Sequence, residues 1–221
     1  MTNAEIPEHG RMLFQSAENL RRSAPDLDAM LSSLWEILET KEFFADIADL
    51  GDEDNGGSGE WIATAYTYNA GILSKAKRAP GQRGRSKNPK QIGTISIVVR
   101  LCNSTDLEGD LPDWPWLEQA CLIMGWHLGQ DADDVWKIAN FDPEDEALAS
   151  IGHVGDGLWA WSDEQGENAH FIVLPIFALT DEDALKRFAL RPVKSLFNAN
   201  DPKSVARSAL QDVPVLFPTS S

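Results

Sequence analysis

The pattern of apolar positions is clearest over residues 158–179, where it predicts a β-hairpin. A polar turn at residues 162–168 separates a Trp-rich stretch from residues 170–179, the longest run of β-branched and aromatic residues in the chain. This second arm is apolar at both odd and even positions, so the strand must be covered on both faces. Pro175 cannot donate a hydrogen bond to a strand ladder, and we therefore expect a β-bulge there.

Two further segments have the character of strands and lie on either side of a loop. Residues 60–73 are rich in aromatic and β-branched side chains. In residues 92–102, aliphatic side chains alternate with Thr, Ser, Val and Arg, which predicts a half-buried strand with one face in the core. We expect these two strands to be antiparallel neighbours.

Helical spacing dominates the first fifty residues. Residues 26–39 carry apolar side chains at the i, i+3, i+4, i+7 positions of a packed helix, and Ser23, Pro25 and Asp26 form a start signal. A weaker amphipathic segment precedes it over residues 8–22. A third helix is expected over residues 41–50.

Other helices are expected between and after the strands. Apolar spacing predicts a helix over residues 116–128 and shorter ones over residues 131–139 and 143–151. A capping box formed by Thr180 and Asp183 begins a C-terminal helix that Pro192 should end. A last helix is expected to begin at residues 200–202 and to run to about residue 211.

These elements predict an α+β protein made of one domain, residues 1–221. It has a helical N-terminal part over residues 8–50 and a linker rich in Gly and acidic residues over residues 51–59. The remainder, residues 60–212, should hold an antiparallel sheet of about four strands with inserted and C-terminal helices.

Charge narrows the range of functions. The chain has 35 acidic and 19 basic residues, a net charge of −16, with 43% hydrophobic residues and eight tryptophans. So negative a protein is unsuited to binding nucleic acid or an anionic membrane with its whole surface, and it suits a partner with a basic face. The simpler interpretation is that the acidity only maintains solubility.

Acidic residues and tryptophans are concentrated together in residues 106–146. This region has twelve acidic residues against one basic residue, Lys137, and it contains four tryptophans. Indole side chains supply contact area and carboxylates steer association, so the region is a candidate surface for a basic protein partner. The alternative is that the tryptophans are core residues and the acids a solvated rim. The candidate partner-binding residues are Asp113, Trp114, Trp116, Asp131, Asp133, Asp134 and Trp136.

The opposite charge is concentrated in residues 75–90, which contain seven basic and no acidic residues. Two prolines and two glycines indicate a loop. Such a loop suits phosphate or nucleic-acid contacts, although it lacks aromatic residues for base stacking. The alternatives are a solvated loop, or a loop that docks on the acidic surface of a second copy and so forms a homo-oligomer. The candidate phosphate-binding residues are Lys75, Lys77, Arg78, Arg83, Arg85, Lys87 and Lys90.

Catalytic signals are weak. His153 and Asp156 lie in a Gly-rich segment that we interpret as a loop before the central hairpin, and loops at strand ends often hold active-site groups. Cys102 or Cys121 could act as a nucleophile with a histidine base, although Cys121 falls on an apolar face. The spacing of His, Cys and acidic residues matches no zinc or EF-hand motif, and no nucleotide-binding glycine motif is present. We therefore expect no metal site and no cofactor.

The leading hypothesis is a non-enzymatic interaction protein that binds and neutralises or regulates a basic protein partner. An immunity protein, an antitoxin or an inhibitor of a nucleic-acid-handling machine, whose carboxylates could imitate a nucleic-acid backbone, would have these properties. The first alternative is a nucleic-acid or nucleotide binder that uses residues 75–90, and the second is a hydrolase with a His153–Asp156 pair. The N-terminus has no signal-peptide pattern and no apolar run approaches the roughly 20 residues that span a bilayer, so we expect a bacterial-type cytoplasmic location and no membrane contact.

Overall fold

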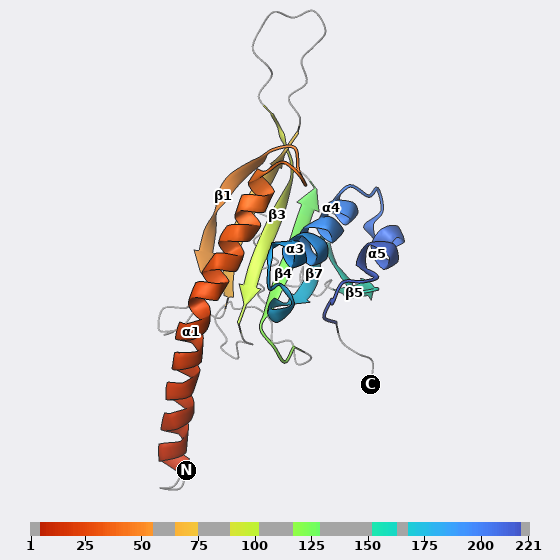
Figure 1. The fold of residues 1–221 in the computed structure, drawn as a ribbon. Helices are drawn as coiled ribbons and strands as arrows, with labels where there is room; N and C mark the ends of the chain where they lie inside the picture. Colours follow the sequence, from red (N-terminus) through yellow and green to blue (C-terminus); the bar gives the residue numbers. More distant parts are fainter. Residues whose placement is uncertain are drawn as a thin grey trace, which may run out of the picture.

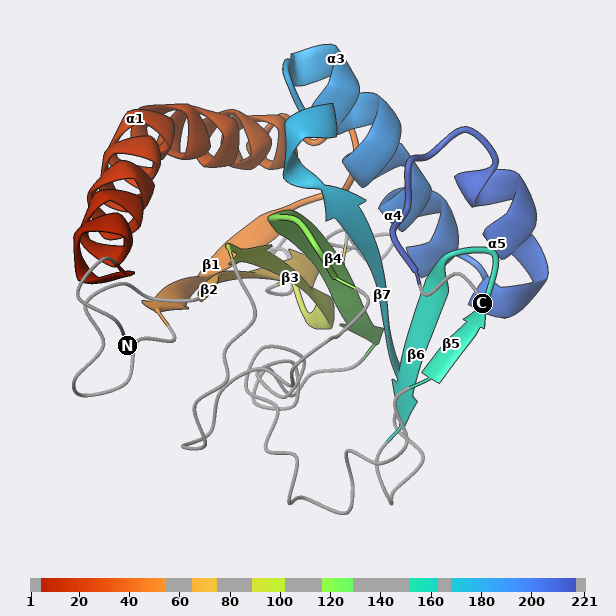
Figure 2. The ribbon, with the colours of Figure 1, turned by 90° about the horizontal axis from the view of Figure 1, so that it is seen from below.

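A long N-terminal helix, an antiparallel sheet and a group of C-terminal helices make up the structure, a computed structural model that describes residues 5–54, 65–74, 89–101, 117–128, 152–162 and 168–217. The long helix and the C-terminal helices lie on the same side of the sheet (Figures 1 and 2). The predicted α+β class is therefore confirmed.

In the described ranges the sheet has seven strands, where the sequence predicted about four. Their order is β1-β2-β3-β4-β7-β6-β5, and every neighbouring pair is antiparallel. The strands are β1 (Ile47–Asp54), β2 (Ala65–Leu73), β3 (Gln91–Arg100), β4 (Cys121–Leu128), β5 (Gly152–Gly155), β6 (Leu158–Ser162) and β7 (Asn168–Pro175).

Two of the additional strands replace predicted helices, so these predictions were wrong. Within residues 116–128, the segment Cys121–Leu128 is the central strand β4, and all its side chains except that of Leu128 are buried. A short run that is apolar on every side has no periodicity to distinguish a buried strand from a buried helix. Within residues 41–50, the chain turns at Lys41, whose φ is 62°, and then enters β1, which extends into the predicted linker as far as Asp54.

The predicted pairings are confirmed, with two corrections. Strands β2 and β3 are antiparallel neighbours, and β6 and β7 form the predicted hairpin. Strand β3 is not half-buried, because every side chain from Gly93 to Arg100 is buried. Pro175 makes no bulge: it is the last residue of β7, pairs in register with Cys121, and is followed by a short 3₁₀ turn, Ile176–Ala178. The strand thus ends where the proline would interrupt its ladder.

Helix α1 (Glu5–Glu39) joins the two predicted N-terminal helices into one. Pro25 lies inside it and removes one helical N–H donor, and the axis of the helix bends along its length (Figure 2). In the C-terminal half, Leu34, Ile37 and Leu38 are buried against the sheet. The N-terminal half extends beyond the sheet (Figure 1).

The C-terminal helices begin as the sequence predicts but do not end where it predicts. Asp181, not Thr180, caps the first helix, since its carboxylate accepts the Ala184 N–H at 2.8 Å. Pro192 does not end that helix, because a wider π-helical turn precedes it and accommodates the missing donor. The elements are α3 (Glu182–Ala184), the π-helical turn Leu185–Leu190, α4 (Arg191–Phe197) and α5 (Pro202–Leu210).

The predicted start of α5 is confirmed. Asp201 accepts the N–H of Lys203 at 3.1 Å, and Pro202 occupies the first turn, where a helix needs no donor. Helices α4 and α5 complete the cover of the sheet that α1 begins. The predicted helices over residues 131–139 and 143–151 lie outside the described residues.

Candidate functional site

Two grooves run along the flanks of α1, one on each side. The α1–β1 groove has a volume of about 500 Å³ and is formed by α1 with β1, β2 and β3. The α1–α3 groove has a volume of about 580 Å³ and lies between α1 and the segment that leads into α3. Their positions follow from the fold, because a single helix on a wide sheet leaves room on both of its sides.

The α1–β1 groove combines three carboxylates with two aromatic rings. Asp28 and Glu36 come from α1 and Asp49 from β1, and among the described residues none of these three carboxylates makes an ion pair. Trp35 and Tyr68 also line this groove. Guanidinium and ammonium groups bind to carboxylates and to the faces of aromatic rings, so this groove has the chemistry of a site for Arg or Lys side chains.

Two local hydrogen bonds hold the walls of the α1–β1 groove. The carboxylate of Asp49 accepts the N–H of Gly51 at 2.9 Å, where Gly51 has a φ of 101° and produces an irregularity in the β1–β2 ladder. The indole N–H of Trp35 donates to Glu39 one helical turn further on at 3.2 Å. The Trp35 ring is therefore oriented by α1 itself.

The α1–α3 groove is mainly apolar. Its apolar lining includes Leu27 and Met30 of α1 and Leu185 of the C-terminal helices, and Phe177 at its edge is 76% exposed. Asp26, on α1, lines this groove without an ion pair among the described residues.

Two further carboxylates on the α3 side of this groove are already engaged. Asp181 caps α3, and Glu182 pairs with Lys186 at 2.6 Å. The hydrogen bond that Lys186 donates to the Glu182 carboxylate, helped by the charges of Glu182 and Glu42, raises the pKa of Lys186 above its usual value. The free negative charge of both grooves therefore comes mainly from α1 and β1.

Among the residues that the structure describes, no Lys, Arg or His side chain lines either groove. No group of three or more His, Cys, Asp or Glu side chains in the described ranges is arranged to hold a metal ion. The carboxylates of the α1–β1 groove are thus arranged along a surface rather than around one point. This arrangement is suited to an extended cationic partner.

The residues that the sequence nominated for partner binding all lie outside the described residues. This applies to Asp113, Trp114, Trp116, Asp131, Asp133, Asp134 and Trp136. One tryptophan of the same acidic region, Trp126, is described. It is 1% exposed and stacks on His170 with ring centroids 5.7 Å apart, so Trp126 is a core residue and not a surface anchor.

Only one nominated phosphate-binding residue lies in the described ranges, Lys90, which is exposed. Its backbone closes the end of the β2–β3 ladder: the Ser74 N–H donates to the Lys90 carbonyl at 2.7 Å, and the Lys90 N–H donates to the Ser74 hydroxyl at 3.0 Å. Two hydrogen bonds therefore join Ser74 and Lys90 at the end of the β2–β3 ladder. Lys75, Lys77, Arg78, Arg83, Arg85 and Lys87 lie outside the described residues.

The candidate catalytic pair is not assembled. His153 belongs to strand β5 rather than to a loop, and its Nε2 accepts the Gly157 N–H at 3.1 Å while its ring stacks on Phe217 at 5.1 Å. Asp156 has a φ of 53° in the β5–β6 turn and lies 3.5 Å from the Nε of Arg207. Both side chains thus stabilise the turn and its contact with the C-terminal segment.

Cys121 is a buried free thiol at the start of β4. Burial raises its pKa to about 12, although the nearby charge of Arg100 opposes this shift. A thiol with such a pKa is protonated at neutral pH and is a poor nucleophile. The core position that the sequence predicted for Cys121 is confirmed, on a strand rather than on a helix.

Polar residues are buried on the sheet face opposite the helices, which the sequence analysis missed. The register places Asn69, Ser96 and Gly125 side by side across β2, β3 and β4, and the Ser96 hydroxyl hydrogen-bonds to the Asn69 carboxamide oxygen. The available signal was the alternation in β3, which we interpreted as a solvated face. The buried polar residues of this face are Thr67, Asn69, Thr94, Ser96, Arg100 and His127.

Comparison with protein-family models, with curated proteins and with solved structures found no match to this chain. In the described ranges, none of the helices has the length and apolar character needed to span a bilayer.

Proposed function

We propose that this chain is a protein-binding module that docks a basic amphipathic segment of a partner protein against α1. The observation that carries the proposal is that both grooves beside α1 contain carboxylates and that, in the described part of the chain, no basic side chain lines either of them. The acidic net charge of −16 attracts such a partner at long range.

The two grooves offer different contacts to such a segment. Arg or Lys side chains of the partner would occupy the α1–β1 groove, between Asp28, Glu36 and the Trp35 ring. Apolar side chains of the same segment would occupy the α1–α3 groove, over Leu27 and Met30. The partner segment would contact α1 on both of its sides. This is a variant of the helix-in-groove mode of peptide recognition, with two grooves in place of one.

Charge reversal in the α1–β1 groove is the experiment that tests this function. The probe is a synthetic amphipathic helical peptide of Lys and Leu, titrated against the full chain and followed by tryptophan fluorescence and calorimetry. Asp28→Lys and Glu36→Lys should each weaken binding about tenfold or more, because each removes a favourable contact and adds a repulsive one. Added salt should weaken binding to the unmodified protein.

The matched control is Asp212→Lys, which changes the net charge equally at an exposed position beyond α5. It should leave the affinity within about twofold, as a distant exposed charge acts only through screened long-range attraction. Equal losses of peptide affinity in all three variants would show that binding depends only on net charge. That result would reject the α1–β1 groove as the site. The α1–β1 groove would also be rejected if the peptide bound to the Trp35→Leu variant and changed its tryptophan fluorescence as much as that of the unmodified protein.

A further inference from the structure

A regular seven-residue spacing of leucines runs along the whole of α1. Leu13, Leu20, Leu27 and Leu34 are each separated by seven residues. A second row, four residues after each leucine, contains Ala17, Ala24, Leu31 and Leu38. Such a spacing places both rows on one face of a helix and is typical of helices that pair with another helix.

The sheet uses only the C-terminal half of this face. Leu34 and Leu38 are fully buried there, whereas Leu13 is 72% exposed. Every residue from Gly10 to Ala17 is exposed, and this part of α1 extends away from the sheet (Figure 1). A solvated helix without packed neighbours has little stability of its own, because helical stability in proteins comes chiefly from packing of the apolar face.

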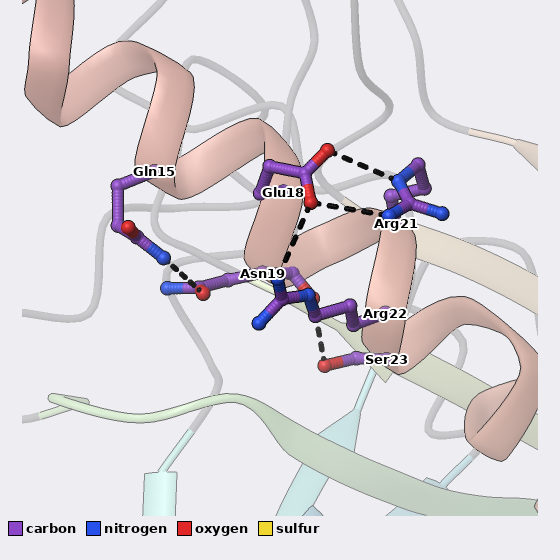
Figure 3. A network of polar contacts seen from close by, with 6 residues as sticks. All are labelled: Gln15, Glu18, Asn19, Arg21, Arg22 and Ser23. Atoms are coloured by element: carbon purple, nitrogen blue, oxygen red, sulfur yellow. Dashed lines mark hydrogen bonds and ion pairs between the residues drawn. The ribbon is translucent and has the colours of Figure 1, made fainter.

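Polar contacts within the exposed half lie beside the leucine row and not across it. Figure 3 shows Glu18 between Arg21 and Arg22, which approach its carboxylate to 3.1 and 3.6 Å, and Gln15 hydrogen-bonded to Asn19 at 2.8 Å. Exposed pairs of this kind contribute only a few tenths of a kcal/mol each. They stabilise the helix slightly and leave its apolar face without a partner in the described structure.

We propose that the N-terminal half of α1 pairs antiparallel with the same segment of a second copy, so that the protein forms a homodimer. In this pairing, residues whose numbers sum to 30 lie at the same level. Leu13 of each copy then faces Ala17 of the other, and Leu20 faces Gly10. Every layer places a large side chain against a small one, which allows the helices to approach closely.

Charge and the remaining exposed apolar residues agree with the antiparallel orientation. The same alignment places Arg11 of one copy one residue away from the level of Glu18 of the other, on the flank where the two Phe14 rings, each 68% exposed, lie near the two-fold axis. Residues 10–22 contain three basic residues and one acidic residue, so the acidic excess of the whole chain is absent from this segment. The pairing ends at Leu20, which with Asn19 also lines the near end of the α1–α3 groove, so the dimer and the proposed partner site meet there, whereas Asp28 and Glu36 of the α1–β1 groove lie outside the pairing.

Sedimentation and light scattering of the full chain test the dimer at increasing protein concentration. The unmodified protein should pass from monomer to dimer. Leu13→Asp should remain a monomer because it places a charge in the seam, the row of Gly10, Leu13, Ala17 and Leu20 where the two helices meet. Gln15→Asp adds the same charge on the outer face of the same helical turn and should dimerise like the unmodified protein. Circular dichroism checks that each variant keeps its fold.

Two results would overturn the dimer. One is a monomeric mass over the whole concentration range, and the other is a Leu13→Asp variant that dimerises as well as the unmodified protein. These results do not depend on binding of a basic peptide, because Asp28 and Glu36 lie outside the seam.

Disulfide trapping tests the antiparallel orientation. A mixture of Leu13→Cys and Ala17→Cys proteins, distinguished by mass, should give mainly the mixed disulfide under mild oxidation. A parallel pair would give mainly the two symmetric disulfides and would contradict the register. Gln15→Cys and the unmodified protein, with its native Cys102 and Cys121, are the controls and should stay uncrosslinked.

Discussion

Replacing Gly93 by alanine should lower the free energy of unfolding by about 3 kcal/mol and the melting temperature by roughly 6–12 °C. An added Cβ would lie 2.6 Å from the backbone carbonyl oxygen of His127 and 2.7 Å from Cε2 of Phe197. The carbonyl belongs to the central strand β4 and cannot move without disturbing the sheet. The Phe197 ring is itself held edge-to-face against Phe44 with centroids 5.6 Å apart.

The comparison for this prediction is Gly10→Ala, the same chemical change in open space. No atom lies within 4 Å of the Cβ that it would add, and Gly10 is inside a helix, where alanine is favoured by up to about 1 kcal/mol. Urea unfolding at low protein concentration measures both variants. A Gly93→Ala protein as stable as the unmodified one would show that α4 does not pack on β3 as described.

Leu34→Ala should cost about 3 kcal/mol, whereas Leu13→Ala, in the same helix and the same leucine row, should change stability by less than about 0.5 kcal/mol. Leu34 is completely buried between α1 and the sheet, and Leu13 is 72% exposed. Removing three buried carbon atoms loses their transfer free energy and leaves a cavity. The comparison isolates burial, because residue type, substitution and secondary structure are identical.

Urea unfolding at a concentration where the protein is monomeric measures this pair of variants. Equal stabilities would mean that the C-terminal half of α1 is no more attached to the sheet than its N-terminal half. That result would also mean that α1 does not form the two grooves with the sheet and the C-terminal helices. The proposed function therefore depends on the outcome for Leu34, and the proposed dimer does not.

Sequence reasoning succeeded where the apolar pattern had one period, or where a run of β-branched and aromatic residues followed a polar turn. The alternation in β3, the hairpin of β6 and β7, and the apolar spacing of residues 26–39 each predicted the right element. It failed at β4, which is apolar on both faces like β7 but has one β-branched residue, Ile123, so that neither alternation nor composition distinguished it from a helix. It also failed at Pro25 and Pro192, where bending of the helix and a π-helical turn accommodate a residue that more often ends a helix.

The grooves beside α1 could not be predicted from the sequence for a different reason. Asp28 and Asp49 are 21 positions apart, and Tyr68 comes from a third element, so only the packing of α1 on the sheet brings them together. The acidic character of the chain was visible in its composition, but its distribution on the surface depends on tertiary structure. The seven-residue leucine spacing of α1 was present in the sequence, and its significance became apparent once α1 proved to be continuous through Pro25.

Site-specific photo-cross-linking in the native host is the most direct test of the claim that α1 docks a basic partner segment. A photoreactive amino acid is placed at Ser32 in the α1–β1 groove, at Ser23 in the α1–α3 groove, and at the exposed Ser208 on α5 as a control. If α1 docks a basic partner segment, one protein is captured from both grooves and not from Ser208, through a peptide that carries Lys or Arg beside apolar residues. Capture of nucleic acid, of an acidic peptide, or of the same products from Ser208 would contradict it.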